Sequence, residues 1–201
     1  IELRAYNLGT PETAQSRVFS WLSYPTLPDK NLIVIARDDD LMFGLLQSRF
    51  HELWSLRKGS DLQDRPRYTH TSTFATFPFP DGMTPDTPVE TACAVEGANA
   101  IATAAQNLDR LRTSWLWPEG SWREVSEEAP GLPVRRVPID QAAADLLRAR
   151  TMTELYNERP EWLQLAHRAL DDAVALAYDV PSTISDDDAL GMLLEKNLDR
   201  V

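Results

Sequence analysis

The sequence predicts a mainly α-helical protein with a small β part (α+β), in which a helical bundle follows two short strands. Two observations indicate the helices: apolar residues recur every three or four positions over residues 38–58, and residues 89–116 are rich in alanine. A third indicates the strands, because the apolar residues before position 38 fall in runs of strand length. The chain has 201 residues, 43% of them hydrophobic, so it can bury a core.

The predicted strands are residues 17–23 and 31–37. The first, RVFSWLS, partly alternates between apolar and polar residues, and the second, NLIVIAR, is an apolar run with polar flanks, as in a buried strand. SYPTLPDK between them contains two prolines and predicts a turn. Residues 1–16 show no clear element.

The first predicted helix covers residues 38–58 and ends at Gly59. Its acidic start, Asp38 to Asp40, and its basic end, Arg57 and Lys58, match the preference of the helix dipole. Further helices are predicted at about 89–116 with a weak point at Gly97, at 140–155, from Pro160 onward, and at 186–199 after a Ser185 cap. Residues 59–87 and 117–138 are predicted loops, the first because prolines interrupt it.

The charge is unevenly distributed along the chain. The formal net charge of -11 argues against an isolated nucleic-acid binder. All of it comes from residues 81–201, which hold 22 acidic and 11 basic residues, whereas residues 1–80 are neutral. The basic residues of that neutral part are concentrated towards its end, so a local anion-binding surface remains possible there.

The sequence shows no membrane-crossing run and no signal peptide, so we expect a cytoplasmic protein without a membrane partner. Its single cysteine, Cys93, excludes an internal disulfide. The chain starts at Ile1 and lacks an obvious first element, which leads us to expect a piece of a longer protein.

No catalytic or cofactor-binding motif stands out. Asp38 to Asp40 follow a predicted strand, where magnesium sites are often built, but a helix N-cap explains them better. Three scattered histidines and one cysteine lack the spacing of zinc ligands. His167 precedes Asp171 by four residues, which predicts that the two pair on one helix face as packing residues. We therefore predict no catalytic, metal-binding or cofactor-binding residue in this chain.

The segment RPRYTHTSTFATFPFP, residues 65–80, is the candidate binding element. Its cations and hydroxyls suit phosphate oxygens, its tyrosine could stack on a base or pack against a sugar, and two further cations precede it. If the segment folds back, the cations gather on one surface. The predicted DNA-binding residues are Arg57, Lys58, Arg65, Arg67, Tyr68, His70, Thr71 and Thr73.

A structural role competes with this interpretation. Phe74, Phe77 and Phe79 have a spacing near two, which predicts an extended segment with one buried face. We favour that role for the phenylalanines. For the cations and threonines, solvation of a surface segment and phosphate binding both stay open on the residues alone.

Three motifs in order resemble one protein family. They are SRFHELW at 48–54, RYTHTSTFATFPFP at 67–80, and LYNERPEWLQLAHRALDDAV at 155–174. Together they resemble the C-terminal region of the class I SAM-dependent DNA methyltransferases of the type IIL restriction–modification kind. The resemblance covers most of residues 27–198 but omits 117–138.

The resemblance implies a division of the chain at residue 35. Residues 1–35 would end a target-recognition domain, and residues 36–201 would form a C-terminal helical domain with the loop 59–87 and the variable loop 117–138. An N-P-P-Y motif that presents a flipped adenine, and the S-adenosylmethionine site, would lie in an upstream methyltransferase domain. The implied partners are double-stranded DNA and that upstream domain.

The resemblance favours phosphate binding by residues 57–73, with base reading assigned mainly to upstream strands. In this interpretation the chain is a DNA-recognition and scaffolding piece without catalytic residues of its own. The alternative is a stand-alone acidic helical domain that binds proteins, which the net charge and the lack of a catalytic motif favour.

Overall fold

The computed structural model describes residues 6–23, 26–62, 65–126 and 134–199, and of residues 6, 60–62 and 65 it describes the backbone. The described chain forms two compact units. Unit 1 consists of residues 1–105 and 168–201, and unit 2 of residues 106–167. The mainly helical α+β prediction is confirmed. None of the helices in the described ranges is long and apolar enough to cross a membrane.

Unit 1 begins with a three-stranded antiparallel sheet rather than two strands. Its strands are β1 (Tyr6–Pro11), β2 (Ser20–Ser23) and β3 (Leu32–Ile35), in the order β2-β1-β3. Leu8 in β1 lies opposite Trp21 and Ile35 and is fully buried. The prediction that residues 1–16 contain no element was therefore wrong. Asparagine, glycine and proline in β1 have low strand propensity, and the two partner strands override it.

The predicted helix 38–58 is two helices, α1 (Asp40–Gln47) and α2 (Arg49–Lys58). Ser48 separates them in an extended conformation, with φ -71° and ψ 157°, and caps α2 by accepting from the backbone N–H of His51. Buried Gln47 accepts from the backbone N–H of Phe19 at 2.8 Å. The break thus depends on a tertiary contact that helical periodicity does not reveal.

Asp39, the middle one of the three aspartates, is the N-cap residue of α1. Its carboxylate accepts from the backbone N–H of Met42 at 2.9 Å and pairs with Arg37 at 2.7 Å. The N-cap interpretation is confirmed. No group of metal-ligating side chains occurs anywhere in the described ranges.

The core of unit 1 lies where α1 meets later helices. An added Cβ on Gly44 would lie 2.7 Å from Ile101 Cγ2 and 3.2 Å from Leu170 Cδ1, so the glycine permits this close approach. The contacting helices are α4 (Ala98–Leu116) and α7 (Glu161–Ala177). α4 follows the short helix α3 (Val89–Cys93) after a break at Gly97, whose φ is +85°. The weak point predicted at Gly97 is confirmed, and the single helix 89–116 is not.

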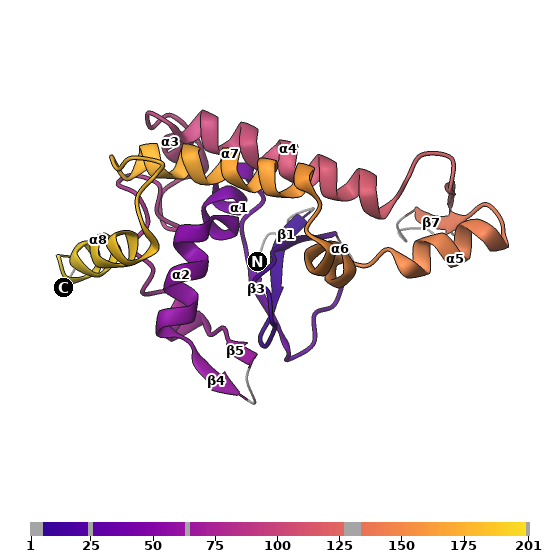
Figure 1. Ribbon diagram of the computed structural model, residues 1–201, viewed down its shortest axis with the longest axis horizontal. Coiled ribbons are helices and arrows are strands. Elements are labelled where there is room, and N and C mark those ends of the chain that lie inside the picture. The colour runs from indigo at the N-terminus through magenta and orange to yellow at the C-terminus, as the bar shows by residue number, and fades with distance from the viewer. Residues whose placement is uncertain (1–5, 24–25, 63–64, 127–133, 200–201) are drawn as a thin grey trace. The chain divides into compact units, whose positions relative to one another are not determined.

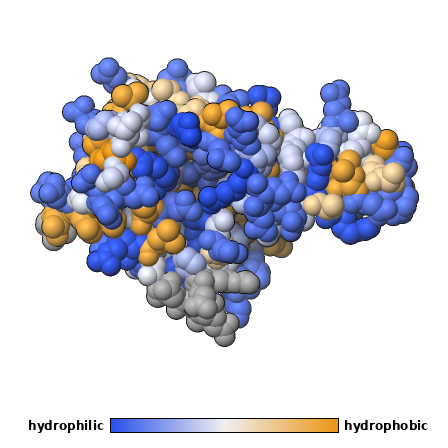
Figure 2. All heavy atoms as spheres, in the orientation of Figure 1, coloured by the Kyte–Doolittle hydropathy of each residue, from blue (hydrophilic) through white to orange (hydrophobic). Residues whose placement is uncertain are grey.

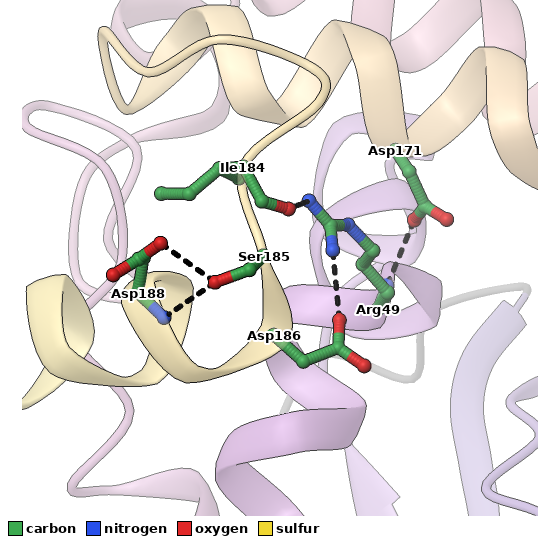
Figure 3. A network of polar contacts seen from close by, with 6 residues as sticks. All are labelled: Arg49, Asp171, Ile184, Ser185, Asp186 and Asp188. Atoms are coloured by element: carbon green, nitrogen blue, oxygen red, sulfur yellow. Dashed lines mark hydrogen bonds and ion pairs between the residues drawn. The ribbon is translucent and has the colours of Figure 1, made fainter.

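The last helix of unit 1 is fixed by a polar network shown in Figure 3. Ser185 caps α8 (Asp186–Leu198) by accepting from the Asp188 backbone N–H, as predicted. Arg49 donates to Asp186 at 2.8 Å and to the Ile184 carbonyl at 3.0 Å. Its backbone N–H donates to Asp171 at 2.8 Å. Burial raises the pKa of Asp171 to about 7. The start of α2 thereby anchors both α7 and α8.

Unit 2 contains strands where a loop was predicted. Residues 117–138 include β6 (Trp122–Val125) and β7 (Arg135–Pro138), paired antiparallel. The predicted helix 140–155 is two helices, α5 (Gln141–Ala149), capped by Asp140, and α6 (Met152–Glu158), capped by Thr151. The Thr151 side chain accepts from the Glu154 backbone N–H, so a capping residue again marks a break that the apolar pattern passes over.

Candidate nucleic-acid interface

The region 59–87, predicted as a loop, contains regular structure that folds the candidate segment back on α2. It holds β4 (Ser60–Leu62), β5 (Arg65–Arg67) and a short π-helix, η1 (His70–Phe74). Ser60 pairs with Arg67 in the antiparallel register of β4 and β5. In Figure 1, α2 leads directly into this hairpin. The fold-back considered from the sequence is therefore present.

Gly59 makes the turn from α2 into the hairpin possible. An added Cβ there would lie 2.6 Å from the carbonyl oxygen of Ser55 and 2.8 Å from that of Arg67. Both contacts are with backbone, which cannot swing aside as a flexible side chain can. The absence of a side chain at Gly59 thus lets the basic end of α2 approach β5.

The structure exposes five of the eight predicted DNA-binding residues, which we call the basic surface: Arg57, Lys58, Arg67, His70 and Thr71. The side chain of Arg65 lies outside the described residues. The face of the molecule seen in Figure 2 is mainly hydrophilic, with hydrophobic side chains in small patches. The positions of these side chains do not show whether they contact phosphates, so DNA binding by the basic surface stays a prediction.

Two cations of the basic surface are held by neighbouring groups. Arg67 pairs with Glu12 at 2.6 Å, and the Arg67 side chain remains 47% exposed. The Lys58 ammonium lies 5.1 Å from the ring centroid of buried Trp54. An exposed ion pair and a cation–π contact at the surface each contribute little stability, of the order of 1 kcal/mol or less. They orient the two side chains and leave them open to solvent.

Tyr68 corrects one of the predicted DNA contacts. Its side chain is fully buried, so its ring cannot stack on a base or a sugar. Its hydroxyl lies 3.1 Å from His51 Nε2, and burial raises the pKa of the phenol. Sequence reasoning failed here because tyrosine carries both an apolar ring and a polar tip, and either can decide its position.

His51 is the buried partner of Tyr68. Desolvation lowers the pKa of its ring to about 3, so it is neutral at pH 7. Its Nδ1 lies 2.9 Å from the Leu46 carbonyl oxygen, which can only accept. Nδ1 therefore carries the proton, and Nε2 accepts from the Tyr68 hydroxyl. Both ring nitrogens are satisfied in the interior.

Arg17 is a further buried residue of this site, and sequence reasoning missed it. It is 7% exposed, and its guanidinium lies 4.9 Å from the ring centroid of Tyr68. It donates to Thr10 Oγ1 at 3.1 Å and to the carbonyl oxygens of Pro11 and Pro66. Nothing in the local sequence distinguishes a buried arginine from a surface one, since folding brings its partners, the Thr10 hydroxyl, the Tyr68 ring and two backbone carbonyls, to it.

Thr73 also corrects a predicted DNA contact, because it is fully buried. Its hydroxyl accepts from the backbone N–H of Thr69, the N-cap residue of η1, at 3.3 Å. The structural role predicted for the phenylalanines is confirmed for Phe77 and Phe79, which are buried. The extended conformation is wrong for Phe74, which lies in η1 and is half-buried.

His167 and Asp171 do not form the pair that their spacing predicted. His167 Nε2 lies 2.9 Å from the Tyr156 hydroxyl within unit 2, and burial lowers its pKa to about 4. Asp171, in unit 1, accepts from the backbone of Arg49. Helical spacing allowed the pair, but each side chain instead bonds to a residue outside its own helix.

The chain shares its fold with part of one solved structure, the type IIL restriction–modification enzyme MmeI in complex with DNA. The TM-score is 0.66 at 21% sequence identity. The match covers 99% of this chain and 22% of the MmeI chain, so this chain spans about a fifth of the length of that enzyme. No protein-family model and no curated protein matches the chain.

Proposed function

We propose that this chain is the C-terminal part of a site-specific, SAM-dependent DNA adenine methyltransferase of a restriction–modification system. The observation that carries the proposal is the likeness to MmeI, a DNA-bound enzyme, over 99% of the chain. The three ordered motifs of the sequence support it. S-adenosylmethionine would be bound by an upstream methyltransferase domain, and the residues of this chain would support target recognition and DNA binding.

Within this function the basic surface would hold the DNA backbone. Arg57 and Lys58 end α2, and Arg67 in β5 is brought against them through Gly59. Exposed cations on β5 and the end of α2 suit phosphate oxygens, while the exposed His70 and Thr71 add hydrogen-bonding groups. Phosphate contacts set orientation without reading sequence, so base specificity would come from other residues.

The methyltransferase proposal is tested by methyl transfer. Labelled S-adenosylmethionine and plasmid DNA are incubated with the full-length protein that carries this chain, and with the chain alone as control. We expect incorporation into adenine by the full-length protein and none by the chain. An inert full-length protein with an intact cofactor site, tried on several DNAs, would contradict the proposal.

The basic surface is tested by the salt dependence of DNA binding. The plot of log K against log salt concentration has a negative slope, and each lost phosphate contact reduces the magnitude of that slope by about 0.9. We expect the double variant Arg57→Ala/Lys58→Ala of the full-length protein to lower the slope by about 2 on any duplex. An unchanged slope in a folded variant would remove the basic surface from the DNA interface.

The second candidate function is an acidic helical domain that binds a protein partner. It rests on the excess of acidic residues over 81–201, 22 against 11 basic. The same two experiments separate it from the first candidate: it predicts no methyl transfer by the full-length protein and no effect of Arg57 or Lys58 on DNA binding.

A further inference from the structure

We propose that Arg17 is a positioning residue for DNA binding, which holds β5 from beneath so that Arg67 faces the DNA backbone. This inference rests on the proposed function, because it names a residue behind the basic surface. Arg17 precedes β2 and is distant in sequence from the hairpin, yet it reaches the backbone between Arg65 and Arg67: Arg17 Nη2 donates to the Pro66 carbonyl oxygen at 3.2 Å.

The contacts of Arg17 connect β1 with β5. Its guanidinium donates to Thr10 and Pro11, at the end of β1, and to Pro66, in the middle of β5. The planar five-donor guanidinium can serve several acceptors in fixed directions, which a lysine ammonium on a flexible stem cannot reproduce. Arg17 is 7% exposed and cannot meet a phosphate itself. Its effect on DNA must therefore pass through the strand that it holds.

Three further contacts join Arg67 and Tyr68 to Glu12 and Thr13. The backbone N–H of Tyr68 donates to the Glu12 carbonyl oxygen at 2.7 Å, and Thr13 forms a β-bridge with Arg67. The Glu12 carboxylate accepts from Arg67 Nε at 2.7 Å. Residues 12–17 thus hold β5 by backbone and side-chain contacts, and Arg17 supplies the one that enters the interior.

Tyr68 and His51 pack near Arg17 and restrict the movement of β5. The Tyr68 ring contacts both Arg17 and His51, with its centroid 4.9 Å from the guanidinium and 5.5 Å from the imidazole centroid. Both rings are fully buried and the Tyr68 hydroxyl is bonded to His51. A well-packed ring of this kind leaves β5 little freedom to shift outward, provided that Arg17 holds the Pro66 carbonyl.

The test is a double-mutant cycle on the full-length protein. Arg17→Lys keeps the positive charge but replaces the planar five-donor guanidinium by an ammonium. Any change in the salt dependence of DNA binding must therefore come from altered geometry and not from altered charge. The binding of a labelled duplex is measured by fluorescence anisotropy at 50 and 200 mM NaCl for Arg17→Lys, for Arg67→Ala and for the two combined. Losing one phosphate contact lowers the ratio of the two affinities about three- to fourfold.

The matched control is Arg37→Lys. Arg37 is another buried arginine of unit 1, 6% exposed, which donates to the carbonyl oxygens of Pro85 and Thr87 and has no contact with β5 among its hydrogen bonds. We expect Arg37→Lys to lower thermal stability as Arg17→Lys does but to leave the affinity ratio unchanged. A merely structural role for Arg17 would make the two variants alike in both measurements.

We expect Arg17→Lys to lower the ratio by up to the factor seen for Arg67→Ala, with no further loss when the two are combined. An unchanged ratio in Arg17→Lys, or an equal loss in the presence and absence of Arg67, would overturn the inference while leaving the effects of Arg57 and Lys58 as support for the proposed function. If no cation of the basic surface alters the ratio, the DNA-binding role proposed for that surface fails together with the inference, whereas the methyltransferase proposal is decided by the methyl-transfer experiment.

A second measurement does not depend on DNA. Hydrogen exchange of the Tyr68 amide reports directly on the contact between β5 and Glu12. We expect this amide to exchange faster in Arg17→Lys and at the wild-type rate in Arg37→Lys. Wild-type exchange in Arg17→Lys would show that Arg17 does not hold β5, and would overturn the inference even where the variant lowers stability.

Discussion

Two two-stranded antiparallel sheets in the described residues, one in each unit, use arginine in different ways. The β4–β5 hairpin of unit 1 is supported from the interior by Tyr68 and Arg17, which are buried, while Arg67 remains at the surface. In unit 2, Arg136 of the β6–β7 hairpin lies over two half-buried rings, 4.3 Å from the centroid of Trp122 in β6 and 5.8 Å from that of Trp117, which precedes the hairpin.

The difference concerns which arginine stabilises the hairpin. In unit 2 the guanidinium of Arg136 covers two indole rings, and Trp122 Nε1 donates to the Trp117 carbonyl oxygen at 3.2 Å. A surface cation is thereby used in the packing of its own strand. In unit 1 a separate, buried arginine does this, so the surface arginine can serve a partner. An exposed arginine on a hairpin is therefore informative only once the packing beneath it is known.

The test with the largest expected effect removes the aromatic side chain that supports each hairpin. Tyr68→Ala deletes a fully buried ring, and we expect a loss of about 3–5 kcal/mol in the free energy of unfolding. Trp122→Ala should cost clearly less, because that ring is half-buried. Urea titration of both variants measures the difference. Equal losses would contradict the distinction between interior and surface support.

A second test uses the glycine before each hairpin. Gly59→Ala would force a Cβ to within 2.6 Å of the Ser55 carbonyl oxygen, and we expect a cost of about 1–3 kcal/mol. At Gly120 an added Cβ meets nothing within 4 Å, but φ is +79°. Gly120→Ala should therefore cost only backbone strain, about 1 kcal/mol.

Urea titration ranks the two glycine variants. A second readout separates their causes, since the clash at Gly59 is with the strand that carries Arg67 and the strain at Gly120 is local. Gly59→Ala should weaken DNA binding by the full-length protein and Gly120→Ala should not. Equal DNA binding by the two would show that the approach of α2 to β5 is irrelevant to the interface.

The third test is pH dependence, which unit 1 should show through His51. The pKa of His51 in the folded protein, about 3, lies below its ordinary value of 6.5, so between these values the unfolded state binds more protons. The contribution of neutral His51 to the free energy of unfolding is fully present above about pH 6.5. It is lost as the pH falls towards 3, at up to about 1.4 kcal/mol per pH unit. His51→Gln should flatten this part of the stability curve.

The control for His51 is His70→Gln, a change at an exposed histidine of the same region. We expect it to leave the acid limb of the curve as in wild type. The measurement is the urea midpoint at pH steps between 4 and 7. If the acid limb is the same in His51→Gln as in wild type, the buried neutral histidine does not contribute to it.

The smallest effects on stability are expected from the exposed arginines themselves. Arg67→Ala breaks a surface ion pair and should cost less than about 1 kcal/mol, yet it should lower the salt slope of DNA binding by about 1. Arg136→Ala uncovers two indole rings and should leave the slope unchanged. A lowered slope for Arg136→Ala would place unit 2 on the DNA and remove the contrast between the hairpins.

Local signals in the sequence determined much of the fold. The Asp39 and Ser185 caps, the weak point at Gly97 and the helix after Pro160 are confirmed, because capping and glycine effects act over a few neighbouring residues. The predicted burial of Phe77 and Phe79 is also confirmed, because large apolar rings at this spacing favour burial in many contexts.

Tertiary structure alone decided the remaining features. It added β1 to the sheet, divided the helix at Ser48 through the contact of Gln47 with Phe19, and turned Tyr68 inward onto His51. It also buried Arg17 against the carbonyl groups of Pro11 in β1 and of Pro66 in the distant strand β5. Amphipathic and polar side chains have favourable places both inside and outside a protein. Whether such a side chain lies inside or outside depends on partners that are distant in sequence, and only the folded chain brings those partners together.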